Sequence, residues 1–186
     1  MSIVSAQSVA TFPDNSTFSQ SDWTALSDMW YPLALEEEVG EKPIAKQVLD
    51  IPIVIARLGE EYVVAKDLCV HRGAPLTEGW VNGSCIVCPY HGYEYDSQGE
   101  CKKVPSDPNW KIPSRIRLET YLHEVKYGLI WVCLSGEPKN CLPNWEPEAD
   151  NPDFLRFVMG PEIWECSSGR AIENFIDNAH FSFVHR

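Results

Sequence analysis

Two short pairs of potential metal ligands constrain this chain more than any other feature of its sequence. Cys69 and His71 form a Cys-x-His pair, and after sixteen intervening residues Cys88 and His91 form a Cys-x-x-His pair. Two thiolates and two imidazoles can bind a tetrahedral zinc ion. They can also bind a binuclear iron–sulfur cluster, with the cysteines on one iron and the histidines on the other.

The residues around the two pairs distinguish these alternatives. The first pair continues as Cys-Val-His-Arg-Gly-Ala-Pro-Leu (69–76), and the second as Cys-Pro-Tyr-His-Gly-Tyr-Glu-Tyr-Asp (88–96). A zinc site does not need a glycine close to each histidine and a proline nearby. A cluster between two loops does, because backbone amides must approach the sulfides closely and glycine and proline shape such loops. The two segments resemble the signature of Rieske iron–sulfur proteins, and zinc is the weaker alternative.

Composition indicates a globular chain without a nucleic-acid partner. The 186 residues are 44% hydrophobic and include seven Trp, enough for one full domain and part of a second. A net charge of −12 argues against binding to phosphate backbones. No apolar stretch reaches the roughly 18 residues of a membrane span. Residues 1–27 lack the pattern of a targeting signal and are expected to form a polar tail.

The seven cysteines are an odd number, which favours a reducing, cytoplasmic compartment over a secreted disulfide scaffold. Cys85 forms a C-x-x-C with Cys88, but its strand-like surroundings favour a core side chain. His123, in an alternating run, is expected to face solvent. The remaining cysteines are also expected to fill the core: Cys101, Cys133, Cys141 and Cys166.

Short strands and turns alternate from Trp30 to about Leu134. Residues 51–58 and 62–65 predict a hairpin, and Asn82-Gly83 is a strong two-residue turn signal. Further turns are expected at 97–99 and at 126–128, the latter after a strand over 115–125. Many short strands without helices predict an antiparallel all-β domain over residues 28–136. Each ligand pair then closes a loop within it.

The pattern changes after this domain. Residues 137–161 contain five prolines and several acids, and are expected to form a linker. Apolar residues then follow helical i, i+3, i+4 spacing from Ile172 to Phe183, which predicts a helix over about 169–183. Residues 162–186 are expected to begin a second domain.

A second candidate metal site lies at the end of the chain. Asn174, Asp177, His180 and His185 occur within Glu-Asn-Phe-Ile-Asp-Asn-Ala-His-Phe-Ser-Phe-Val-His. Two histidines plus a carboxylate on one face of an iron leave open positions for dioxygen. A five-residue spacing places the histidines about 140° apart on a regular α-helix. We therefore expect a π-type turn, or a helix that ends before His185.

Both motifs occur in the order found in the Rieske non-haem iron oxygenases, the ring-hydroxylating oxygenase α-subunit family, which this chain resembles from about Trp30. The resemblance implies an all-β Rieske domain of antiparallel sheets with two cluster-binding loops. It also implies that the beginning of an α+β helix-grip-type catalytic domain follows. Cys69 and Cys88 would bind one iron of a 2Fe–2S cluster, and His71 and His91 the other.

The same resemblance implies roles for the second site. His180 and His185 would bind a mononuclear Fe(II), with Asn174 nearby. Asp177 would link a cluster histidine of a neighbouring subunit to an iron-binding histidine, within a homotrimer. Electrons from NAD(P)H would arrive through a separate reductase or ferredoxin. They would support O2-dependent hydroxylation or demethylation of a small aromatic or cyclic organic substrate.

The sequence departs from the family pattern in three places. It stops at Arg186, before the family's downstream carboxylate ligand, so we expect a truncated oxygenase. Tyr93 stands where many members have Trp, and either ring can shield the cluster. The extra cysteines and hydroxyl of high-potential respiratory Rieske proteins are missing. Fewer hydrogen bonds to the sulfides then predict a potential toward the low end of the Rieske range, which begins at roughly −150 mV.

Two alternatives remain open from the sequence. A stand-alone Rieske ferredoxin would carry electrons without catalysis, but it would not need the four polar residues of the second site. Within the oxygenases, the loops also resemble single-component members such as vanillate demethylase-like enzymes, which we rank above the two-subunit dioxygenases.

Overall fold

The computed structural model describes residues 9–149, 151–155, 157 and 163–185. They form two compact units, the first ending at Trp145 and the second beginning at Glu146. None of the described helices is long and apolar enough to cross a membrane. Parts of the expected tail, linker and second domain lie outside the described residues, as does Arg186.

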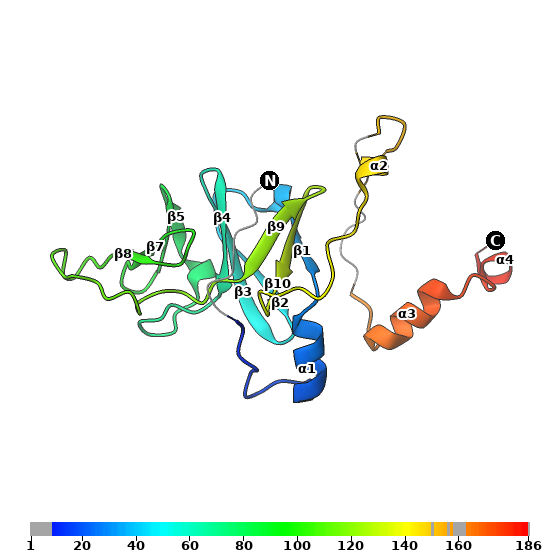
Figure 1. Ribbon diagram of the computed structural model, residues 1–186, viewed down its shortest axis with the longest axis horizontal. Coiled ribbons are helices and arrows are strands. Elements are labelled where there is room, and N and C mark those ends of the chain that lie inside the picture. The colour runs from blue at the N-terminus through cyan, green and yellow to red at the C-terminus, as the bar shows by residue number, and fades with distance from the viewer. Residues whose placement is uncertain (1–8, 150, 156, 158–162, 186) are drawn as a thin grey trace. The chain divides into compact units, whose positions relative to one another are not determined.

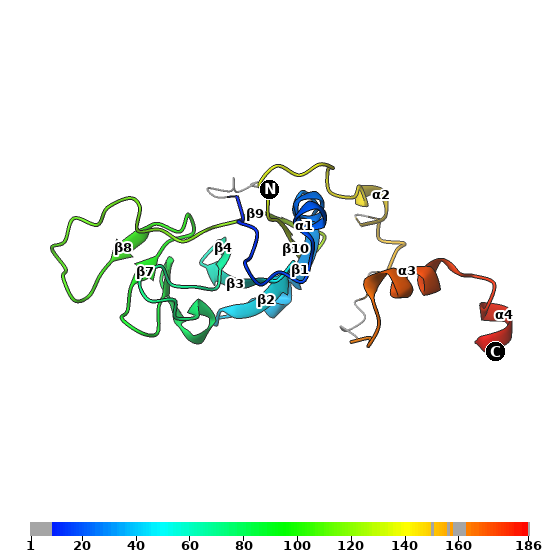
Figure 2. The same ribbon diagram turned by 90° about the horizontal axis from the view of Figure 1, so that it is seen from below.

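Three antiparallel sheets make up the first unit, so the expected all-β fold is confirmed for it. Figures 1 and 2 both show the third sheet at one end of this unit, with the second sheet between it and the first. The first sheet has the order β1 (Tyr31–Leu35), β10 (Leu129–Cys133), β9 (Leu122–Lys126), and the second β2 (Ile44–Val48), β3 (Ile51–Leu58), β4 (Glu61–Lys66). The third has the order β5 (Trp80–Asn82), β6 (Cys85–Val87), β7 (Glu94–Tyr95), β8 (Cys101–Lys103).

The expected hairpins form, but one expected strand is shorter than predicted. β5 and β6 pair through Asn82 and Cys85, and this hairpin lies in sequence between the two ligand loops. The strand expected over 115–125 is regular only from Leu122. Upstream of it the chain makes only isolated bridges, such as Glu100 with Arg117. The sequence upstream of Leu122 alternates like a strand, but its backbone pairs with neighbouring segments only at single residues.

Strand β3 supplies both hydrophobic cores of the first unit because successive side chains of a strand point to opposite faces. Ile53 and Ile55 pack into the core that includes β10. Val54 packs on the other face, into the core beside the third sheet. Cys69 and Cys88 belong to this second core. The two ligand loops are therefore anchored in the interior of the domain.

The polar tail expected over residues 1–27 is wrong for its described part. Helix α1 (Gln20–Ser27) begins after Ser19, whose side chain accepts the N–H of Asp22. Trp23 of this helix is buried, and its indole Nε1–H donates to the Leu49 carbonyl at 3.0 Å. Isolated apolar residues in a polar stretch carry no periodicity, so the sequence did not indicate that they pack on the domain.

The linker expected from residue 137 remains packed on the first unit over its first part. The Trp145 ring lies 5.2 Å from that of Tyr127 and 5.8 Å from that of Trp131, measured between ring centroids. Tyr127 also donates a hydrogen bond from its hydroxyl to the Pro143 carbonyl. These contacts explain why the first unit extends to Trp145.

The second unit contains α2 (Glu146–Ala149), α3 (Ser168–Ile176) and α4 (Phe181–Val184). The continuous helix expected over 169–183 is wrong, because residues 177–180 are not helical. There the Asp177 carboxylate accepts the Ala179 N–H at 2.9 Å, a local bond that competes with helical hydrogen bonding. The expectation of a helix that ends before His185 is confirmed.

Candidate metal centres

The two ligand loops, residues 68–76 and 88–93, share one backbone hydrogen-bond pattern. In each, the cysteine N–H donates at 2.9 Å to the carbonyl five positions later. The N–H four positions later donates back to the cysteine carbonyl, and its residue is Gly73 in one loop and Gly92 in the other. Both glycines have a φ of 69°, a left-handed conformation that L-residues with a side chain rarely adopt. The turn itself therefore requires the glycine beside each histidine.

The four candidate ligands come together as two pairs. Cys69 and Cys88 are 2% and 1% exposed, and interaction with Cys69 contributes to the raised pKa of the Cys88 thiol. The rings of His71 and His91 are exposed, with their centroids 4.6 Å apart. Among the described residues, no three His, Cys, Asp or Glu side chains converge where they could hold one metal ion. Paired thiols and paired imidazoles fit two bridged irons better than one tetrahedral zinc.

Local electrostatics act differently on the two pairs. Burial raises the pKa of the Cys88 thiol, and hydrogen bonds from the backbone N–H groups of Tyr90 and His91 oppose this increase. The same N–H groups would stabilise a thiolate on iron. Partial desolvation and the nearby His91 lower the pKa of His71. A neutral imidazole, which the lowered pKa favours, is the form that ligates metals.

A tyrosine packs against each exposed histidine. The rings of Tyr93 and His71 are stacked, with their centroids 4.7 Å apart and their planes within 7°. The Tyr90 ring centroid lies 3.9 Å from that of His91. These contacts restrict the rotation of both imidazoles. Tyr93 thus contacts the candidate cluster site at the position where Trp is common in the oxygenases.

Two residues at this site were not singled out from the sequence. Tyr95 is fully buried on β7, with its hydroxyl 3.2 Å from Cys69 Sγ. Burial and Cys69 raise its pKa, so the hydroxyl keeps its proton and can donate to the sulfur. The alternation Tyr93-Glu94-Tyr95 was the available signal, because it places both tyrosines on one face of the strand. Asp67, two residues before Cys69, is the second and is taken up below.

The second histidine pair also assembles, although it does not lie on a continuous helix. His180 directly precedes α4 and His185 directly follows it, and their ring centroids are 5.3 Å apart. Asp177 Oδ2 lies 3.3 Å from His180 Nδ1. Asn174 lies exposed in the last turn of α3. The break after Ile176 thus brings together two histidines whose spacing would separate them on a regular helix.

His123 is not a solvent-facing strand residue, as its alternating sequence had suggested. It is 4% exposed, and its Nδ1 lies 3.1 Å from the Tyr121 carbonyl. Leu122 beside it is buried as well, so both faces of β9 are covered at this end. Burial lowers the pKa of the His123 imidazole.

The remaining cysteines divide between core and surface. Cys85, Cys101 and Cys133 are buried, which confirms the core interpretation for these three, and burial raises the pKa of Cys101 to about 11. Cys141 and Cys166 are exposed, so the same interpretation was wrong for them. Both occur in stretches without a regular strand or helix, where an apolar side chain has no core to enter.

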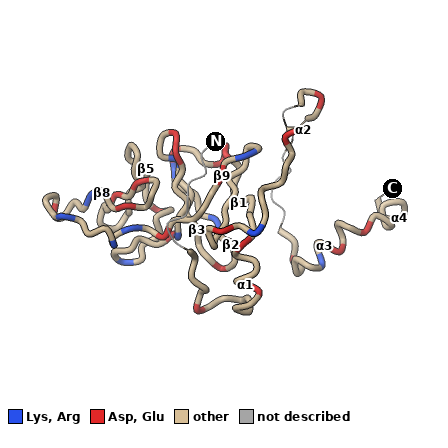
Figure 3. The backbone as a smooth tube through the Cα atoms, in the orientation of Figure 1, with Lys and Arg blue, Asp and Glu red and all other residues tan. Residues whose placement is uncertain are grey.

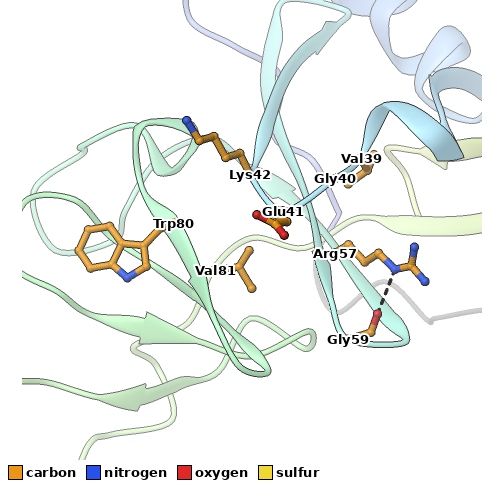
Figure 4. Close-up of a pocket in the computed structure, with 8 residues that line it drawn as sticks. All are labelled: Val39, Gly40, Glu41, Lys42, Arg57, Gly59, Trp80 and Val81. Carbon is orange, nitrogen blue, oxygen red and sulfur yellow. Dashed lines mark hydrogen bonds between the residues drawn. The ribbon is translucent and has the colours of Figure 1, made fainter.

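The residues that line a surface groove of about 620 Å³ include none from the two ligand loops (Figure 4). Its charges are mixed, because Glu41 lies among the cations Lys42 and Arg57, and Arg57 Nε–H is bonded to the Gly59 carbonyl at 3.0 Å. Figure 3 likewise shows acidic and basic residues interspersed along the first unit. The charges of the groove therefore do not favour ligands of one sign. It is lined by Val39, Gly40, Glu41, Lys42, Arg57, Gly59, Trp80 and Val81.

Comparison with known families identifies the first unit. A family model described as "Rieske [2Fe-2S] domain" matches residues 29–127, more than half of the chain and both ligand loops. The chain belongs to the Rieske 2Fe–2S family. Its buried thiol pair and its facing imidazole pair fit the cluster that defines this Rieske domain.

Relatives of the chain include two demethylases. The chain is 35% identical to methylxanthine N1-demethylase NdmA of Pseudomonas putida, over 86% of this chain and 47% of the relative. It is 32% identical to the oxygenase component of dicamba O-demethylase of Stenotrophomonas maltophilia, over 88% of this chain and 48% of the relative. The solved structure of NdmA from P. putida CBB5 superposes with a TM-score of 0.75 at 34% identity, covering 89% of this chain and 52% of that one. The chain spans about half the length of these relatives.

Proposed function

We propose that this chain is the Rieske domain and the start of the catalytic domain of an oxygenase component. Its reaction would be the O2-dependent demethylation, at nitrogen or oxygen, or the hydroxylation of a small cyclic compound. One observation carries the proposal: a paired cysteine–histidine site and a second histidine pair with an adjacent carboxylate both assemble in one chain. The demethylase relatives support the reaction class.

At the first site, Cys69 and Cys88 would hold one iron and His71 and His91 the other. A bound 2Fe–2S cluster accepts and passes on single electrons. The buried cysteines keep water from the sulfur side, while the exposed imidazoles present their N–H groups to a partner. Electron entry would come from an NAD(P)H-linked reductase or ferredoxin.

At the second site, His180 and His185 would supply two ligands of a mononuclear Fe(II). With Nδ1–H of His180 donating to Asp177, its Nε2 remains available as the metal ligand. A further carboxylate from outside the described residues would complete the facial arrangement that leaves positions for dioxygen. Asn174 would lie close to this iron.

Asp177 would also connect the two sites between subunits. It already orients His180 and accepts the Ala179 N–H, and its exposed side chain can accept a further hydrogen bond. In a homotrimer, a cluster histidine of the neighbouring subunit would be that donor. Electrons would then pass from the cluster of one subunit to the iron of the next.

The experiment that tests this function uses the full-length protein that contains the chain, a reductase, NADH and O2. N- and O-methylated cyclic compounds are supplied, and released formaldehyde is measured, because oxidation of an N- or O-methyl carbon releases it as formaldehyde. We expect substrate-dependent formaldehyde with one of the compounds. Asp177→Asn should keep the cluster spectrum and the bound iron but lose turnover. Electron transfer to an added acceptor, without product from any substrate, would instead support a ferredoxin-type carrier.

A further inference from the structure

A buried carboxylate closes the first ligand loop at its base. Asp67 follows β4 and precedes Cys69 by two residues. Its Oδ1 accepts the Thr77 N–H at 2.9 Å, and its Oδ2 accepts the Thr77 hydroxyl at 2.7 Å. Its own N–H donates to the Pro52 carbonyl on β3 at 2.9 Å. The side chain of Asp67 therefore joins the two ends of the loop, and its backbone N–H ties them to the second sheet.

We infer that Asp67 is a positioning residue for the cluster, which holds Cys69 Sγ within reach of the Tyr95 hydroxyl and thereby raises the reduction potential. The inference rests on the proposed cluster at Cys69 and Cys88. Asp67 then does more than stabilise the loop, because it sets the length of the hydrogen bond between the Tyr95 hydroxyl and Cys69 Sγ.

The Cys69–Tyr95 contact crosses from one loop to the other. Tyr95 follows the second loop and is fixed on β7, opposite Ile86 on β6. Cys69 belongs to the first loop, whose hydrogen bond from Cys69 N–H to the Ala74 carbonyl is internal to that loop. An internal bond shapes the loop but does not fix its position relative to the sheets. Asp67 supplies that connection at the end nearest the sulfur.

The direction of the effect follows from charge. Reduction adds negative charge to the cluster and its thiolates, so a hydroxyl that donates to Cys69 Sγ stabilises the reduced form more than the oxidised form. Weakening this bond lowers the potential. For a one-electron couple, a tenfold loss in the reduction equilibrium corresponds to about 59 mV.

The chain offers a matched control for a purely structural role. Asp50, between β2 and β3, accepts the Thr17 N–H at 2.7 Å and the Thr17 hydroxyl at 2.9 Å. These two bonds share one carboxylate oxygen with a third, from the Ser16 hydroxyl at 3.3 Å, and together they tie the N-terminal segment to a turn that bears no ligand. A variant at Asp50 removes a comparable clamp without moving Cys69.

The test measures reduction potentials by EPR-monitored titration of the cluster-loaded chain, with melting temperatures measured in parallel. We expect Asp67→Ala to reduce the equilibrium constant for reduction of the cluster about tenfold. This corresponds to a reduction potential lower by about 59 mV. Thr77→Val, which removes only the hydroxyl bond, should give a smaller shift of the same sign. Asp50→Ala should lower the melting temperature but leave the potential unchanged.

A double-mutant cycle separates positioning from general loosening. Tyr95→Phe removes the donor, so Asp67→Ala should cause no further loss of potential in that background. An equal shift with and without the Tyr95 hydroxyl would overturn the inference, as would an equal shift from Asp50→Ala. If Asp67→Ala does not retain a cluster, the same cycle with Thr77→Val decides the question. A wild-type chain without a Rieske EPR signal would instead overturn the proposed function.

Discussion

The two candidate metal sites differ in how much of the structure supports them. The cysteines of the first site lie in a hydrophobic core, and its histidines are packed by two tyrosines of the second ligand loop. In the second unit, the described residues of α3 and α4 include no buried side chain. There the histidine pair rests on local contacts within residues 177–185. The first site is thus built by the fold of its domain, whereas the second presents ligands that need further partners.

The largest expected effect comes from substituting a ligand of the first site. Cys88→Ser takes away a buried ligand, so the chain should lose its visible absorption and its iron, from about two per chain to none. Iron and acid-labile sulfide analysis measures this loss. Cys141→Ser changes an exposed thiol of the same unit and should leave both values unchanged. Retention of the full cluster by Cys88→Ser would refute the ligand assignment.

Removal of the second site should leave the first intact. In the full-length protein, His180→Ala should reduce iron from about three to about two per chain, because the mononuclear ion loses a ligand while the cluster remains. The cluster EPR signal should be unchanged. Glu173→Gln, an exposed change in α3, serves as the control. Loss of the cluster signal in His180→Ala would show that the two sites do not assemble independently.

Substitutions of glycine by alanine compare the backbone of the second ligand loop with that of α3. Gly92 has a φ of 69°, and an added Cβ would lie 3.1 Å from Pro105 Cγ, so Gly92→Ala should destabilise the first unit by about 1–2 kcal/mol. Gly169 lies in α3 with open space around it, and Gly169→Ala should stabilise that helix by about 1 kcal/mol or less. Chemical denaturation and helical circular dichroism measure the two effects. Equal tolerance at both positions would contradict the strained turn at Gly92.

The smallest effect is a pH dependence that arises in the first unit. Burial lowers the pKa of His123 in the folded state, so below a pH of about 6.5 the unfolded state binds a proton that the folded state does not. The free energy of unfolding should therefore decrease as the pH falls below about 6.5, by at most about 1.4 kcal/mol per pH unit. Denaturation at several pH values should show a shallower slope for His123→Phe. A slope unchanged by this substitution would contradict the assignment.

Local patterns allowed the first site to be predicted, since Cys69 and His71, and likewise Cys88 and His91, are near neighbours in sequence. Hairpin turns such as Asn82-Gly83 were equally local. Contacts across the fold could not be predicted in this way. The Tyr95 hydroxyl reaches Cys69 only because two loops converge.

Three other differences between the predicted and the observed structure arise from tertiary contacts or from local competition for hydrogen bonds. Trp23 is a core residue because its indole N–H donates to the Leu49 carbonyl and its ring packs among apolar side chains. His123 was misjudged because alternation on a strand does not reveal that both faces are covered. The helix break at Asp177 reflects a side chain that competes with backbone hydrogen bonding, and the apolar spacing on either side of it concealed the break.

The most direct test of the central claim is pulsed EPR spectroscopy of the reduced, cluster-loaded chain. We expect a Rieske signal with hyperfine couplings from the nitrogens of two histidine ligands, and loss of one coupling in His71→Cys or His91→Cys variants. A reduced cluster without nitrogen couplings, or a chain that binds zinc and gives no signal, would contradict it.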